Sequence, residues 1–87
     1  MVDQPIVMTA PTEEYLDCTG LACPLPIVRI SRAMKAMSPG MLLRIDASDA
    51  AFPADLEAWI SGRTDTLVSL EIRGERQSAV IQKGVPA

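Results

Sequence analysis

The sequence predicts an α+β protein, a two-layer α/β sandwich in which two helices cover one face of a four-stranded mixed sheet. Four short segments alternate apolar and polar residues, and two segments repeat apolar residues every three or four positions. Gly and Pro punctuate the boundaries between them. The segments follow in the order β-α-β-α-β-β, and chains of this order usually place both helices on one side of the sheet.

The first half of the chain predicts a strand, a helix and a second strand. We expect residues 1–13 to form a flexible tail, because they carry two prolines and no period, and residues 14–87 to form the single domain. Alternation predicts strands over residues 14–18 and 41–47, and helical spacing predicts a helix over residues 24–37. The apolar face of this helix consists of Ile27, Ile30, Ala33, Met34 and Met37.

The second half predicts a helix followed by two strands. Ser48 or Asp49 is a suitable cap for a helix over residues 53–61, which Gly62 would end. Alternation predicts strands over residues 66–73 and 77–83. In the first of these strands, the apolar residues expected on one side are Val68, Leu70 and Ile72.

Composition narrows the chemistry that the chain can perform. It has no histidine, which excludes Cys-His and Ser-His nucleophile pairs, and two cysteines without histidine make a zinc site improbable. We therefore expect no metal and no cofactor. A net charge of −3 argues against direct nucleic-acid binding, and no apolar run reaches the roughly 20 residues of a membrane span. The start lacks the basic region of a signal peptide, so we expect a cytoplasmic protein with free thiols.

The most informative stretch is Gly20-Leu21-Ala22-Cys23-Pro24-Leu25-Pro26, where strand gives way to helix. Prolines two positions apart are tolerated in the first turn of a helix, because those amides have no intrahelical acceptor. Pro24 and Pro26 thus mark a helix start, with Cys23 at or beside the cap and Gly20 allowing a sharp turn before it. The helix dipole lowers the pKa of thiols in such positions and would stabilise a persulfide anion.

Cys23 also has a plainer interpretation as a small buried hydrophobe, which is the commoner fate of a lone free cysteine. The paired prolines argue against it, since they place the cysteine at the edge of a helix. We favour a reactive thiol.

Residues 17–26, Asp17-Cys18-Thr19-Gly20-Leu21-Ala22-Cys23-Pro24-Leu25-Pro26, closely resemble the opening motif of the TusA (SirA-like) sulfur carriers, D-x-x-G-L-x-C-P-x-P. The resemblance covers about residues 14–84 and includes the Pro39-Gly40 turn. It implies the β-α-β-α-β-β sandwich of that family. It also implies a relay of persulfide sulfur from a cysteine desulfurase or rhodanese-like donor to an acceptor protein. The family's sulfur-bearing cysteine corresponds to Cys23. Other residues that carry the resemblance are Asp49, Asp55, Trp59 and the closing Ile81-Gln82-Lys83-Gly84.

The neighbours of Cys23 have expected roles of their own. We interpret Asp17 as a loop-fixing side chain that bonds backbone amides near Gly20. We expect Arg29 and Asp49 to form part of a surface that docks donor and acceptor proteins. Because the thiol must meet successive partners, we expect a monomer, acting within sulfurtransferase relays rather than as a stand-alone enzyme.

Cys18 occupies a position that the motif leaves free. It could resolve an oxidised Cys23 or accept its sulfur, because a nearby thiol attacks persulfides and disulfides readily. Its plainer interpretation, which we favour slightly, is a strand-end residue packed under the loop.

Three questions stay open at this stage. Where the family has Asp-Pro before the second helix, this chain has Asp49-Ala50 and a proline only at Pro53, which we expect to alter the loop but not the fold. Two rival functions remain: a thiol-disulfide redox switch using Cys18 and Cys23, and a non-catalytic interaction domain that contacts RNA. The resemblance also leaves the pathway open among tRNA 2-thiouridine synthesis, molybdenum-cofactor supply and sulfur oxidation.

Overall fold

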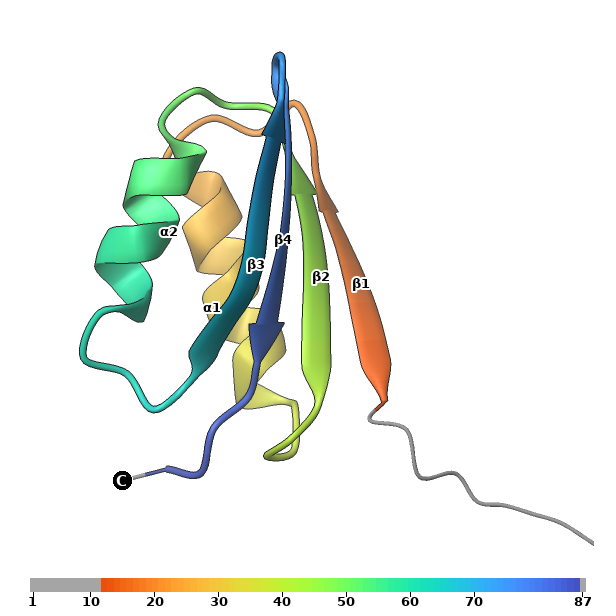
Figure 1. Cartoon of the computed structure of the whole chain (residues 1–87), viewed down its shortest axis with the longest axis vertical. Helices are drawn as coiled ribbons and strands as arrows, with labels where there is room; N and C mark the ends of the chain where they lie inside the picture. The colour runs from red at the N-terminus through yellow and green to blue at the C-terminus, as the bar shows by residue number, and fades with distance from the viewer. Residues whose placement is uncertain (1–11, 87) are drawn as a thin grey trace, which may run out of the picture.

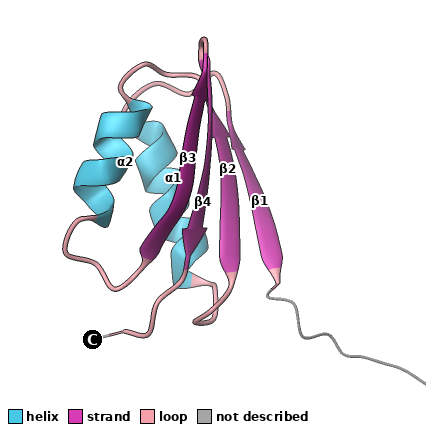
Figure 2. Ribbon diagram, viewed as in Figure 1, coloured by secondary structure: helices cyan, strands magenta, loops and turns pink. Residues whose placement is uncertain are grey.

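The computed structural model describes residues 12–86, which form four strands and two helices in the expected order (Figures 1 and 2). The strands are β1 (Glu13–Cys18), β2 (Leu42–Ala47), β3 (Thr66–Arg73) and β4 (Arg76–Gln82), and the helices are α1 (Leu25–Lys35) and α2 (Phe52–Ile60). The predicted tail, residues 1–13, lies mostly outside the described residues, and Glu13 already belongs to β1. Neither helix in the described part of the chain is long and apolar enough to cross a bilayer.

The sheet has the strand order β1-β2-β4-β3 and is mixed, as predicted. β1 runs parallel to β2, whereas β4 is antiparallel to both of its neighbours. The parallel pair needs a crossover connection, and α1 provides it. Both helices lie on one face of the sheet, and the other face stays open (Figure 1). The α+β sandwich that the sequence predicts is confirmed.

The core lies between the helices and the covered face of the sheet. β2 buries every second residue, Leu43, Ile45 and Ala47, because side chains alternate between the two faces of a strand. α1 buries Ile30 and Met34 on the apolar face expected from its spacing. The other buried apolar side chains of the core are Cys18, Met37, Phe52, Leu56, Ala79 and Ile81.

Of the three β3 residues predicted on the apolar side, only Leu70 packs against the core. A β-bulge shifts the register between Leu67 and Ser69, so Leu67 packs against the core, and Val68 is 54% exposed. Beyond the bulge, Leu70 packs against the core as expected, but Ile72, predicted on the same side, is 59% exposed and is not part of the core. A bulge places two residues opposite one on the neighbouring strand, which interrupts the alternation on which the prediction relied.

The cap predicted for the second helix is also wrong. α2 begins after Ala51, and no side chain caps it. Asp49 lies two residues before Ala51. Its carboxylate accepts a hydrogen bond from the Ala51 amide at 3.2 Å, and its carbonyl accepts one from the Phe52 amide at 3.0 Å. Pro53 lies in the first turn of the helix, where its missing N–H costs nothing.

Asp65 fixes the segment that leads into β3. Its side chain is only 3% exposed and accepts the Gly84 amide and the Arg63 guanidinium, both at 2.8 Å. Burial raises the pKa of this carboxyl, but the hydrogen bonds from Gly84 and Arg63 outweigh burial and hold the pKa below its usual range. This buried carboxylate is therefore fully partnered.

Candidate functional site

Cys23 lies in the connection between β1 and α1, at one end of the molecule. The loop between β2 and α2 and the β3–β4 hairpin reach the same end, whereas the C-terminus lies at the opposite end (Figure 1). Three loops therefore lie at the end of the molecule that carries Cys23 (Figure 1).

The loop that carries Cys23 is fixed at its start. Gly20 has a φ of +82°, a left-handed conformation that glycine adopts without strain, and its amide donates to the Ser48 hydroxyl at 2.8 Å. Asp17 accepts the Thr19 hydroxyl at 2.7 Å and the Thr19 amide at 3.0 Å. These bonds lower the pKa of Asp17. The loop is thus held both by its own strand and by the loop before α2.

Cys23 itself is exposed, one residue before the N-cap of α1. Pro24 occupies the cap position, the peptide bond between Cys23 and Pro24 is cis, and Pro26 is buried in the first turn. The Leu25 amide donates to the Ala22 carbonyl at 2.8 Å and closes a turn around the cysteine. The structure therefore presents the thiol on a hydrogen-bonded turn at the molecular surface.

The expectation of a lowered pKa at Cys23 is not met. The Asp55 carboxylate, in the first turn of α2, accepts a hydrogen bond from the thiol, which raises the thiol pKa above its ordinary value. Partial desolvation and the negative charges of Asp55 and Asp49 raise the pKa further. A carboxylate beside a thiol disfavours the thiolate, whereas the helix dipole alone would favour it.

Cys18 differs from Cys23 in its burial, although the pKa of both thiols is raised. It is the last residue of β1, its exposed fraction is 0%, and it belongs to the hydrophobic core. Burial raises the pKa of its thiol, and the charge of Arg29 offsets this only in part. A buried, protonated thiol is a poor nucleophile, so this placement weighs against a switch that uses both cysteines.

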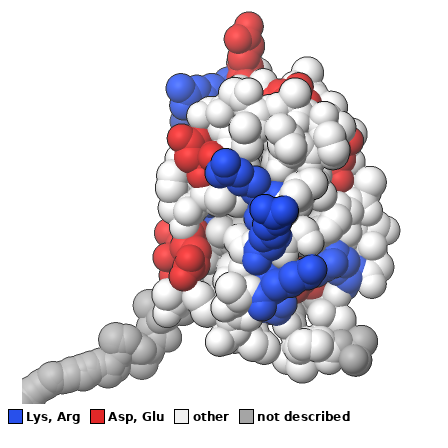
Figure 3. All heavy atoms as spheres, turned by 180° about the vertical axis from the view of Figure 1, so that it is seen from behind, with Lys and Arg blue, Asp and Glu red and all other residues white. Residues whose placement is uncertain are grey.

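The outer face of α1 carries positive charge and no acidic residue. Arg29, Arg32 and Lys35 are all exposed, and Lys and Arg side chains follow one another over the side of the molecule seen from behind (Figure 3). Leu25 and Val28 are also exposed, at 50% and 40%. Asp49 lies in the loop before α2, so the two predicted docking residues come from different elements near the Cys23 end.

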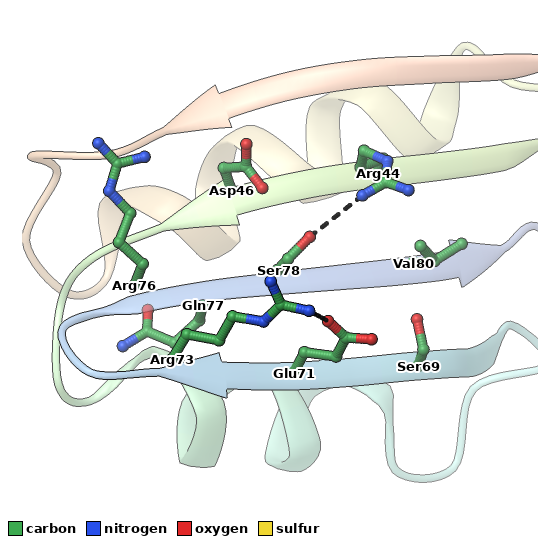
Figure 4. A pocket seen from close by; sticks show the side chains of 9 residues that line it. All are labelled: Arg44, Asp46, Ser69, Glu71, Arg73, Arg76, Gln77, Ser78 and Val80. Atoms are coloured by element: carbon green, nitrogen blue, oxygen red, sulfur yellow. Dashed lines mark hydrogen bonds and ion pairs between the residues drawn. The ribbon is translucent and has the colours of Figure 1, made fainter.

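A separate hollow lies on the open face of the sheet and does not include Cys23. It measures about 400 Å³ and spans β2, β4 and β3 (Figure 4). Its lining carries three arginines and two carboxylates. Arg73 pairs with Glu71 at 3.2 Å, and Arg44 donates to the Ser78 hydroxyl at 3.3 Å. The remaining lining residues are Asp46, Ser69, Arg76, Gln77 and Val80. Cys23 is thus exposed at the surface and lies outside this hollow.

Two residues of the site were not singled out from the sequence. Asp55 figured only as part of the resemblance, and Ser48 only as a helix cap. Their contacts with Cys23 and Gly20 join residues about 30 positions apart. The available signal for Asp55 was its place as the carboxylate in the first turn of the second helix, α2. No signal pointed from Ser48 to the glycine.

The fold and the site together define a class: a small α+β domain that presents one exposed cysteine immediately before a helix that begins with prolines. The comparison with known families agrees with this class. Residues 14–83 match the family described as Sulfurtransferase TusA. The chain belongs to the TusA family, and its role is that of a sulfur carrier.

Three relatives show how the similarity extends along the chain. The sulfur carrier protein TusA of Allochromatium vinosum is 32% identical over 71 residues, which are 82% of this chain and 93% of that protein. YrkI, a candidate sulfur carrier of Bacillus subtilis, is 37% identical over 73 residues, or 84% of this chain and 97% of YrkI. YrkF, another candidate sulfur carrier of that organism, is 41% identical over 69 residues, but these are 79% of this chain and only 37% of YrkF.

Proposed function

We propose that this sulfur carrier holds its sulfur as a persulfide on Cys23. It would receive the sulfur from a cysteine desulfurase or a rhodanese-like protein and pass it to an acceptor protein. The observation that carries the proposal is the contrast between the cysteines: Cys23 is exposed, and Cys18 is buried in the core. Only a sulfur on Cys23 can reach the thiols of other proteins without unfolding the domain.

The transfer is an exchange between a thiol and a persulfide. The Cys23 sulfur attacks the outer sulfur of the donor persulfide, a new S–S bond forms at Cys23, and the donor S–S bond breaks. The donor leaves as a thiolate and regains a proton, so no net oxidation occurs and no outside reductant is needed. Delivery to the acceptor is the same reaction with Cys23 in the role of donor.

The surface around Cys23 supports docking of successive partners. Arg29 on α1 and Asp49 in the loop before α2 carry opposite charges, and exposed Leu25 and Val28 add apolar area. Charges at the rim of an interface steer association, and apolar groups near its centre contribute binding energy. We propose a monomer that works in the cytoplasm and supplies tRNA 2-thiouridine synthesis, molybdenum-cofactor assembly or sulfur oxidation.

Intact-mass spectrometry tests this function. The reduced protein is incubated with a cysteine desulfurase and L-cysteine, alongside Cys18→Ala and Cys23→Ser. We expect wild type and Cys18→Ala to gain one sulfur atom that a reductant removes, and Cys23→Ser to gain none. Loading of Cys23→Ser, or a loss of two hydrogens that needs both cysteines, would refute the proposal.

A further inference from the structure

The loop before α2 and the β3–β4 hairpin, which both reach the Cys23 end of the molecule (Figure 1), line a groove of about 470 Å³. Ser48 and Pro53 lie on one side of the groove, and Ile72, Glu75 and Gln77 lie on the other. Ile72 is directly opposite Gln77 in the pairing of β3 with β4, and Gln77 belongs to the buried face of β4. Residues opposite one another share a face, so Ile72 lies on the helix-covered face of the sheet, and Gln77 borders both this groove and the hollow.

Two side chains of the groove lack the contacts that their positions call for. Ile72 is 59% exposed although it lies on the face that the helices cover. Gln77 is only 5% exposed, and its buried Oε1 accepts no hydrogen bond from any residue that the structure describes. Buried polar atoms without a partner are rare in native proteins. Because the terminal torsion of a glutamine is broad, a small rotation presents the amide to the groove, where an N–H or C=O of an occupant would pair with it.

The charge of the groove is negative. Glu75 is the only charged residue among the described residues that line it. Its neighbours on the hairpin, Arg73 and Arg76, line the hollow on the open face instead (Figure 4). The groove therefore fits a segment with a large apolar side chain, a basic residue and free main-chain amides. The basic outer face of α1 favours the opposite charge.

The groove is connected to the loop that carries the cysteine. Ser48, which lines the groove, accepts a hydrogen bond from the Gly20 amide at 2.8 Å. Gly20 precedes Cys23 by three residues, so their Cα atoms are at most about 11 Å apart. An extended chain with its own cysteine at Cys23 therefore needs only a few residues to reach the groove.

We propose that this groove binds the extended segment of a protein sulfur donor that flanks the donor's persulfide cysteine. A large apolar side chain of that segment packs against Ile72 and Pro53, a basic residue pairs with Glu75, and a main-chain amide pairs with Gln77. The inference rests on the proposed function of Cys23. It adds a second contact area to that of α1, and it assigns the chemistry of the donor segment that the carrier recognises.

Model donor peptides test the groove. Each peptide carries a cysteine activated as its pyridyl disulfide. Attack by Cys23 forms the disulfide between Cys23 and the peptide, breaks the pyridyl disulfide bond and releases pyridinethione, whose absorbance gives the rate. One peptide has a leucine and a lysine separated from the cysteine by three glycines, made in both chain directions, and the faster version is used. The comparison peptide has serine and glutamate in their place.

The proteins compared are wild type, Ile72→Thr and Glu75→Lys, with Cys23→Ser as the blank. Val68→Thr is the matched control for Ile72→Thr, because Val68 is 54% exposed on the same strand and does not line the groove. Glu57→Lys is the matched control for the change in net charge, because Glu57 is exposed on α2 and also lies outside the groove. Circular dichroism confirms that each variant is folded.

We expect wild type to react at least about tenfold faster with the leucine-lysine peptide than with the serine-glutamate peptide, since a buried leucine and an ion pair both contribute. This ratio falls several-fold in Ile72→Thr and in Glu75→Lys, and Val68→Thr and Glu57→Lys keep it. Equal rates of the two peptides with wild type, or an unchanged ratio in either groove variant, would overturn the proposal. The ratio needs only an exposed thiol, so failure of a cysteine desulfurase to load wild type would refute the proposed function separately.

Discussion

Replacement of Cys18 separates the carrier mechanism from a two-cysteine switch. Its side chain has an exposed fraction of 0% and packs in the core under the cysteine loop. Cys18→Ser places a hydroxyl in that apolar site, and Cys18→Ala removes the sulfur without adding a polar group. We expect both variants to lose stability and to keep the ability to load sulfur on Cys23.

The size of the loss follows from the burial. A hydroxyl buried without a compensating hydrogen bond costs about 1–3 kcal/mol in mutational data. Loss of a group the size of one buried methylene costs about 1 kcal/mol. For a domain of this size, a loss of ~2 kcal/mol lowers the Tm by roughly 8–16 °C. Cys18→Ser should therefore be less stable than Cys18→Ala, and both less stable than wild type.

Urea denaturation followed by circular dichroism gives the stabilities, and intact-mass spectrometry below the unfolding transition gives the sulfur loading. Cys23→Ser is the matched control, because that side chain is exposed and its replacement should leave the stability nearly unchanged. Equal stability of Cys18→Ser and wild type would contradict the burial. A folded Cys18→Ala that cannot load sulfur would contradict the carrier mechanism.

Three further predictions concern the loop, a buried carboxylate and the docking surface. Ser48→Ala removes the bond to the Gly20 amide and should cost about 0.5–1.5 kcal/mol in urea denaturation; no change would show that the bond does not hold the loop. Asp65 has a lowered pKa, so its contribution is present above the unfolded value of about 3.9 and is lost as the pH falls through the folded value. Asp65→Asn should therefore destabilise the protein by about 1.5–3 kcal/mol at pH 7 and reduce the loss of stability on acidification, whereas equal acid sensitivity would refute this. Arg29→Glu should slow loading from a protein donor in a salt-dependent way but not from inorganic polysulfide; unchanged kinetics with the protein donor would remove Arg29 from the docking surface.

Local patterns predicted the architecture, because the strands and helices of this protein bury regular faces. β2 is an example: its alternation of apolar and polar residues gave the buried side directly. β3 shows the limit of the method. The bulge is a property of how β3 pairs with β4, because one extra residue of β3 lies opposite a single residue of its neighbour. The sequence of β3 alone does not show where that pairing shifts.

In the candidate site, likewise, local sequence patterns predicted some features, and tertiary packing determined the others. The prolines after Cys23 placed it at a helix start from local rules alone. The electrostatics at the thiol could not be obtained in that way, because Asp55 and Asp49 reach Cys23 from a helix and a loop that lie about 30 residues further along the chain. Which carboxylate faces a thiol depends on how α1 and α2 pack, so the predicted sign of the pKa shift was wrong.

The central claim is that the carried sulfur is on Cys23, and peptide mapping of the loaded protein tests it most directly. The protein is loaded with a cysteine desulfurase and L-cysteine, capped by alkylation and digested with trypsin. Cys18 and Cys23 then share the peptide that ends at Arg29, since no Lys or Arg precedes it. Fragment ions that break the chain between Thr19 and Ala22 assign the extra sulfur. We predict that it is found with Cys23 alone; an extra sulfur on the Cys18 side would contradict the account.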